Sequence, residues 1–292
     1  MRFGHQESRK FIDLLLQVTN NKWANIDANK EIKVGDFGRI DRATGELIVE
    51  GNLYQHPKTR SVMEDYPIEI TATTDFERYL SKGVRELGLS PSVNAGLQPF
   101  ADLGFEGKWE FSRNRGALLI LIAPRISTMQ GFPTETVVEK RFKRILKDRV
   151  FCTDVVSCPA FCLYLGNKTE HVFELSFKAD VPIPAAPGVT AGGGIGTNWK
   201  FSNASGLLKK GRDDRGEYVY HPLYTLKSVK WGKVEPLLRL AEPALLEDAA
   251  RPWSELDDEG EEQIPDSEKS IVSKFQQMLR ELVCIGNARV AK

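Results

Sequence analysis

Residues 103–123 read LGFEGKWEFSRNRGALLILIA and carry the clearest signal of how this chain folds. In the first half, Phe105, Trp109 and Phe111 alternate with charged residues, the pattern of a strand with one buried face. After a short turn, Ala117–Ala123 is apolar throughout, as in a strand that is buried on both faces. The stretch therefore predicts a hairpin of two neighbouring antiparallel strands.

Similar alternation recurs along the chain. Strands are predicted at residues 31–34, 46–50, 150–156, 161–165, 171–179, 195–201 and 218–229. Apolar residues at helical spacing predict one helix carrying Phe11, Leu14, Leu15 and Val18, and further helices at 134–150 and 267–283. These elements predict an α+β protein with a twisted, mainly antiparallel sheet and flanking helices.

Charge divides the chain into a body, residues 1–241, and a tail, residues 242–292. The whole chain has 40 basic and 40 acidic residues, but the tail holds 12 acids and 6 bases, so the body is about +6 and the tail about −6. Coulomb attraction can fold such a tail back on the body and mask it, although a tail that is merely solvated is the alternative.

The tail itself has two predicted parts. Residues 242–268 are rich in Pro, Glu and Asp and are predicted to form a mobile linker that is open to proteases. The helix at 267–283 is expected to dock an apolar face on the body and inhibit it. That face consists of Ile271, Phe275, Met278 and Leu279.

Several function classes find no support in the sequence. No run reaches the ~18–20 apolar residues of a membrane-spanning helix, and the N-terminus lacks a secretory stretch, so a cytoplasmic protein is expected. Neither Gly-x-Ser-x-Gly nor His-Glu-x-x-His occurs, so an enzyme is not expected. The glycine-rich residues 187–196 lack the Lys-Ser/Thr of a phosphate loop, which favours a flexible connection.

The cysteines and histidines also favour structural roles. Cys152, Cys158 and Cys162 lie in apolar strands, so buried thiols are expected rather than a metal site, with a lipid anchor as an alternative. His56 and His221 adjoin prolines and are expected to be structural. No metal or cofactor is predicted.

The helix at 134–150 carries six cations within ten residues, around an apolar stripe. This pattern suits an anionic membrane or a nucleic acid, and the absence of interleaved aromatic residues favours lipid. A solvated helix face is an equally good alternative. The cations expected to contact lipid are Arg9, Lys10, Lys140, Arg141, Lys143, Arg144 and Lys147.

The order of elements over residues 5–235 resembles the pore-forming domain of gasdermins. Residues 8–15, SRKFIDLL, are similar to the first amphipathic helix of that family, and residues 31–36, EIKVGD, to the segment that follows. Residues 119–129, LILIAPRISTM, look like the central strand of the family's sheet. The short tail is more similar to that of fungal members than to the large vertebrate repressor domain.

The resemblance implies an autoinhibited protein that binds anionic lipids and oligomerises into a membrane pore, causing programmed, pyroptosis-like cell death. It implies a monomer or dimer that moves from the cytoplasm to the plasma membrane. A protease or a partner protein would activate it, and neither a cofactor nor a nucleic acid is needed. The alternative is a soluble β-rich interaction or ligand-binding module without catalysis. A hydrolase with an unrecognised site is a third, weaker possibility.

Overall fold

The computed structural model describes residues 4–93, 103–112, 115–133, 136–167, 170–178, 199–202, 205–231 and 245–263. Strands dominate these residues, and all strand pairs within them are antiparallel. The predicted α+β class with mainly antiparallel sheet is confirmed at this level.

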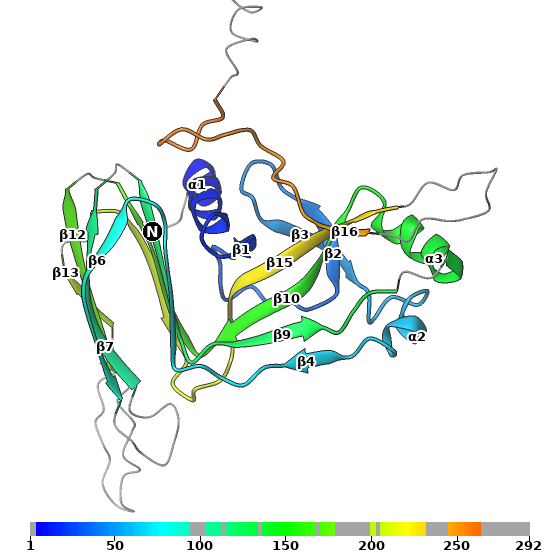
Figure 1. The fold of residues 1–292 in the computed structure, drawn as a ribbon, viewed down its shortest axis with the longest axis horizontal. Coiled ribbons are helices and arrows are strands. Elements are labelled where there is room, and N and C mark those ends of the chain that lie inside the picture. Colours follow the sequence, from blue (N-terminus) through cyan, green and yellow to red (C-terminus); the bar gives the residue numbers. More distant parts are fainter. Residues whose placement is uncertain are drawn as a thin grey trace, which may run out of the picture.

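The largest sheet, sheet A, has eight strands (Figure 1). Its main path runs β1 (Lys22–Ala24), β15 (Tyr220–Lys230), β10 (Val150–Cys158), β2 (Asp36–Ile40) and β3 (Leu47–Asn52). Three more strands join this path, namely β16 (Leu245–Asp248) on β15, β9 (Arg125–Met129) on β10, and β4 (Ile68–Ile70) on β9.

Two four-stranded sheets complete the fold. Sheet B has the order β14 (Leu207–Arg212), β11 (Ala160–Gly166), β8 (Gly116–Ile122) and β5 (Phe76–Leu80). Sheet C has the order β13 (Trp199–Ser202), β12 (His171–Lys178), β7 (Leu103–Phe111) and β6 (Val84–Val93). Sheet C forms one end of the molecule, at the left of Figure 1.

Strand β8 lies between two hydrophobic cores, and this explains why it is apolar on both faces. Leu119 and Leu121 belong to the core shared with the N-terminal helix and sheet A. Leu118 and Ile120 face the opposite way, into a second core that contains the aromatic side chains of sheet C. Alternating residues of one strand thus contribute to both cores.

The hairpin predicted for residues 103–123 is wrong. Both strands exist, but β7 pairs with β6 and β12, whereas β8 pairs with β5 and β11. The reason is burial. A strand that is apolar on both faces needs a covering layer on each side, so β7 lies in the sheet that covers one face of β8 rather than beside it.

Two of the predicted helices are present in the described residues. Helix α1 (His5–Leu16) packs against β1 and β8. Helix α3 (Thr136–Leu146) lies at the far end of sheet A from sheet C and buries Phe142, Ile145 and Leu146 (Figure 1). A short helix, α2 (Arg60–Met63), was not predicted. None of the helices in the described ranges has the length and apolar character needed to cross a membrane.

Other predictions need correction in detail. Residues 31–34 do not form a strand, because the chain turns at Gly35, where φ is +87°, and β2 begins only at Asp36. Strands β1, β4, β5, β6, β9, β14 and β16 were not predicted as separate strands. The glycine-rich residues 187–196, part of the strand predicted at 195–201, and the helix predicted at 267–283 lie outside the described residues.

Candidate functional site

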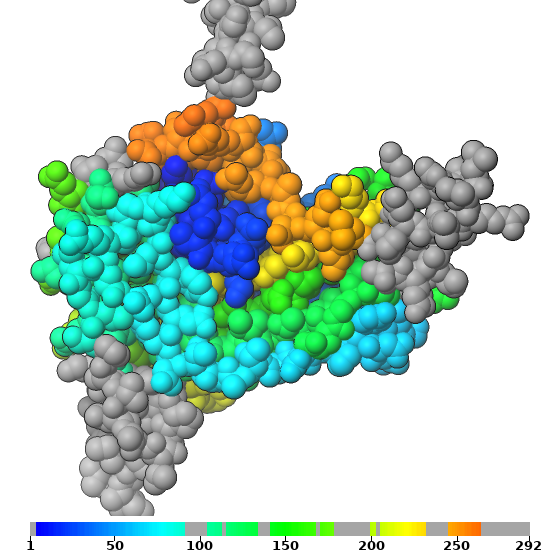
Figure 2. Space-filling model, viewed as in Figure 1, coloured from blue at the N-terminus to red at the C-terminus, as the bar shows by residue number. Residues whose placement is uncertain are grey.

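Residues 245–263, which we call the strap, form an ordered cover over α1 rather than the mobile linker predicted for 242–268. The strap contains eight acidic residues and one basic residue. It begins as β16, which extends sheet A by pairing with β15. Ion pairs join Lys227 to Asp248 at 2.6 Å and Lys230 to Glu247 at 3.1 Å along this edge. Figure 2 shows the strap in orange lying against α1 in blue.

Two apolar side chains anchor the strap in the main core. Trp253 and Leu256 are each only 5% exposed. The ring of Trp253 meets the ring of Trp23 edge to face, with 5.7 Å between the centroids. Gly45 leaves the space for this ring, since a Cβ there would lie 2.9 Å from Trp253. These contacts make the strap part of the folded body.

Beyond Leu256 the strap folds into a tight turn that touches α1. The amide of Asp257 donates to the carbonyl of Glu261 at 2.9 Å, and the amide of Gln263 donates to the carbonyl of Glu255 at 2.8 Å. Gly260 has a φ of +87°, and a Cβ at this position would lie 2.5 Å from the carbonyl oxygen of Gln6 in α1. The turn can approach the helix this closely only because residue 260 is glycine.

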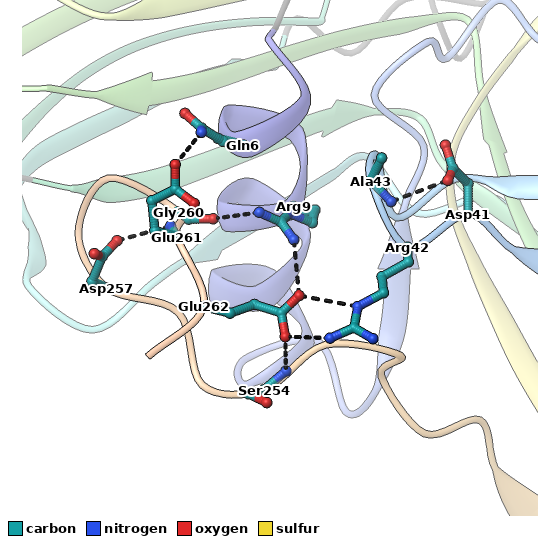
Figure 3. Close-up of polar contacts among 10 residues, drawn as sticks. All are labelled: Gln6, Arg9, Asp41, Arg42, Ala43, Ser254, Asp257, Gly260, Glu261 and Glu262. Atoms are coloured by element: carbon teal, nitrogen blue, oxygen red, sulfur yellow. Dashed lines mark hydrogen bonds and ion pairs between the residues drawn. The ribbon is translucent and has the colours of Figure 1, made fainter. Parts of the chain in front are cut away.

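Glu262 joins three separate parts of the chain (Figure 3). The Arg42 guanidinium donates to both of its carboxylate oxygens, at 3.1 and 2.7 Å. Arg9 of α1 donates at 3.3 Å, and the amide of Ser254 donates at 3.1 Å. The Arg42 guanidinium, followed by the Ser254 amide, lowers the pKa of Glu262 to about 2, so this carboxylate is charged at any physiological pH.

The predicted lipid-binding cations of α1 are therefore covered. Arg9 is 9% exposed and also donates to the carbonyl of Gly260 at 2.9 Å. Lys10 is 7% exposed and donates to the carbonyl of Leu256 at 3.2 Å. Asp13 pairs with Arg251 of the strap in the same way. In this state neither cation is available to a lipid surface.

The predicted cations of α3 lie elsewhere and remain open. Arg141, Lys143, Arg144 and Lys147 are exposed, while the apolar face of the helix is buried. Among the described residues, none of these four pairs with a carboxylate, and the Lys143 ammonium lies 6.0 Å from the ring centroid of Trp231. The side chain of Lys140 lies outside the described residues.

The predicted inhibitory helix face cannot be placed. Ile271, Phe275, Met278 and Leu279 all lie outside the described residues. Among the described residues, the contacts that cover α1 come from the acidic stretch that precedes residues 267–283. Arg42, Trp253 and Glu262 were missed, and the only signal for them was an isolated pair of apolar residues within an acidic run.

Sheet C has two contrasting faces. Its inner face buries a set of aromatic side chains against sheet B, namely Phe105, Trp109, Phe111, Phe173, Phe177 and Trp199. Its outer face is polar, and Lys108 and Glu174 pair across β7 and β12 at 2.9 Å. Strands β6 and β13 are the edges of the sheet. The alternation predicted for β7 and β12 is thus confirmed as burial of one face.

The three described cysteines behave as predicted. Cys152, Cys158 and Cys162 are buried free thiols. Burial raises the pKa of each thiol well above its usual range, so none is poised as a nucleophile.

Comparison of the chain with protein-family models, with curated proteins and with solved structures found no match.

Proposed function

We propose that this protein is an autoinhibited membrane pore-forming protein of the gasdermin type, held inactive by the strap. The observation that carries the proposal is the burial of Arg9 and Lys10, two cations of the N-terminal helix, under a segment with eight acids and one base. The strap supplies acceptors for both cations, so its release would leave Arg9 and Lys10 free to meet an anionic surface.

Release of the strap would free two cations of α1, in addition to the open cations of α3 elsewhere on the protein. Each Lys or Arg near an anionic leaflet contributes roughly 1 kcal/mol to binding. The strap also has a net charge of seven negative, so its departure removes a repulsion between the protein and the membrane. Membrane binding would follow strap release for both reasons.

Sheet C has the composition that insertion into the membrane, the step after binding, needs. Its inner aromatic face can exchange contact with sheet B for contact with lipid, while its outer polar face stays in water. Unpaired backbone groups are too costly in hydrocarbon, so the edge strands β6 and β13 must find partners there. Neighbouring copies of the same chain offer such partners, which makes the inserted form an oligomer.

Cleavage of the strap tests the proposal. A specific protease site is inserted between Ala250 and Arg251, which are both exposed. Cutting there breaks the covalent link between the body and residues 251–263, which make the strap's contacts with α1. A second variant carries the site next to Glu259, at the exposed tip of the turn, where Trp253 stays attached. Dye release from anionic vesicles is measured before and after cutting, with neutral vesicles and an uncleavable insert as controls.

We expect cutting after Ala250 to cause leakage from anionic vesicles only, and cutting at Glu259 to cause less. A cut protein that binds the vesicles yet leaks nothing would favour the interaction-module reading instead.

The role of α3 is tested separately, by charge reversal at Lys140, Arg141, Lys143 and Arg144. Each charge reversal removes an attraction of about 1 kcal/mol and adds a repulsion. Four reversals should therefore weaken binding to anionic vesicles by orders of magnitude. The effect should shrink at 1 M salt, where the Debye length is ~3 Å. Unchanged binding would indicate that the cations of α3 form only a solvated helix face. The matched control reverses four exposed cations outside sheet C, α1, α3 and the strap, namely Lys30, Lys58, Arg60 and Arg215.

A further inference from the structure

A cavity of about 430 Å³ lies at a fork in sheet A, apart from the residues of the strap and α1. Strand β15 occupies one side of β10. On the other side, β10 pairs first with β2, through Val150 and Phe151, and then with β9, through Asp154–Ser157. The pairing of β10 with β15 shifts register between Cys152 and Asp154, and at this point the partner on the other side of β10 changes from β2 to β9. The cavity opens between the branches, walled by residues 31–34 on one side and by β4 and β9 on the other.

One part of this cavity is apolar. Ile32, Val34 and Val155 line it and are almost completely buried, at 3–4% exposure. Ile68 and Ile70 of β4 also line it, but they are 42% and 55% exposed. Among the described residues, these two isoleucines of one edge strand form an apolar wall over an apolar floor, and the wall stays about half exposed.

The other part of the cavity carries a positive charge. The guanidinium of Arg125 lies 3.8 Å from the ring centroid of Tyr218, and its Nε donates to the Ser157 hydroxyl at 3.3 Å. No carboxylate among the described residues pairs with Arg125. The nearby cation Lys33 differs, because Glu31 already pairs with it at 2.9 Å.

One polar atom of a residue that lines the cavity lacks a hydrogen-bond partner among the described residues. The Nδ1 atom of His221 is buried and makes no hydrogen bond to any described residue. A buried ring nitrogen without a partner is costly, whether it donates or accepts. The expectation that His221 is structural leaves this atom unexplained, and because the atom is enclosed by protein it offers no direct contact to a ligand in the cavity.

We propose that this cavity binds a small amphipathic anion, with its carboxylate or phosphate group on Arg125 and its short apolar chain along Ile68 and Ile70. A guanidinium that is stacked on an aromatic ring and fixed at Nε presents its remaining N–H groups in the forked geometry that such anions accept. The volume lies within the range of small-molecule sites. The polar end and the apolar wall together require a ligand that has both properties.

The test measures binding to the full chain by calorimetry, below the micelle concentration of each probe. Decanoate and decyl phosphate carry both parts of the ligand, decanol lacks the anion, and inorganic phosphate lacks the chain. We expect saturable one-to-one binding of the first two, with decanol and inorganic phosphate at least tenfold weaker. Equal binding of decanol would overturn the anionic subsite, and equal binding of inorganic phosphate would overturn the apolar one.

Variants locate the site. Arg125→Gln should weaken decanoate binding by about tenfold or more, because hydrogen bonds to a charged group are lost. Arg60→Gln, which changes an exposed arginine outside the cavity, should have no effect. If Arg125→Gln does not fold, Ile70→Ser decides, since its side chain is exposed and its loss should weaken decanoate but not inorganic phosphate. Unchanged decanoate affinity in either folded variant would refute the site.

Discussion

Truncation of Trp253 should release the strap without unfolding the body. The ring is 5% exposed and lies in the main core, where Trp→Ala typically costs about 3–5 kcal/mol. Its Nε1 is buried and has no hydrogen-bond partner among the described residues, so removing it recovers about 1–3 kcal/mol. At the midpoints of these two ranges the net loss is about 2 kcal/mol, which raises the released fraction about 30-fold.

Amide hydrogen exchange of residues 251–263 measures this change directly. Exchange in the Trp253→Ala variant should accelerate by about 30-fold, and dye release from anionic vesicles should rise with it while the released fraction stays small. Phe132→Ala is the matched control. Phe132 is also buried, at 8% exposure, but packs on Phe142 and Phe151 in the region of α3.

We expect the control to lower thermal stability and leave strap exchange unchanged relative to the body. If the Trp253→Ala variant kept full strap protection, the anchoring argument would be refuted. If the strap were released and no leakage followed, the anchoring argument would stand and the gating role would be refuted.

Three further predictions concern the strap turn and the cores. Gly260→Ala should weaken strap docking, by about 1–2 kcal/mol for the left-handed backbone and more for the approach to α1, whereas Gly131→Ala, at the same φ of +87°, should leave strap exchange unchanged. Strap protection should be constant between pH 8 and pH 5 and weaken only as pH falls from the ordinary Glu pKa of 4.5 toward the value of about 2 for Glu262, so strap opening near pH 6 would contradict the assigned contacts. In a Cys284→Ser background, the three buried thiols of β10 and β11 should resist iodoacetamide at pH 8 and react after denaturation, and rapid labelling of the native protein would show that these strands open.

Local burial was readable from the sequence, but strand pairing was not. The alternation in β7 and β12 and the stripe in α3 reflect one buried face each, which a short window of residues reveals. Whether β7 pairs with β8 depends on the competing strands β11 and β12, whose residues lie about 40–75 positions away along the chain, so the nearest turn signal was misleading. Two cores that share one strand leave no signal in the turn between β7 and β8.

The cover over α1 was hidden for a related reason. Arg9 and Lys10 flank an apolar stripe and were therefore expected to be open to lipid, yet their acceptors come from residues about 250 positions later. Those acceptors are mostly backbone carbonyls, which carry no sequence signature. The acidic run around Glu262 has the composition of disorder, and only Trp253 and Leu256 argue against it.

The place of the strap along the chain has a consequence for the protein's synthesis. Helix α1 leaves the ribosome early, but β1 needs β15 as its partner, so this part of sheet A cannot form until Lys230 has emerged. The strap is complete 33 residues later, at Gln263. At about 5–20 residues per second, translation of that interval takes about 2–7 s. Ribosome stalling within the interval would prolong the lifetime of a nascent chain whose body can fold while its first helix is still uncovered.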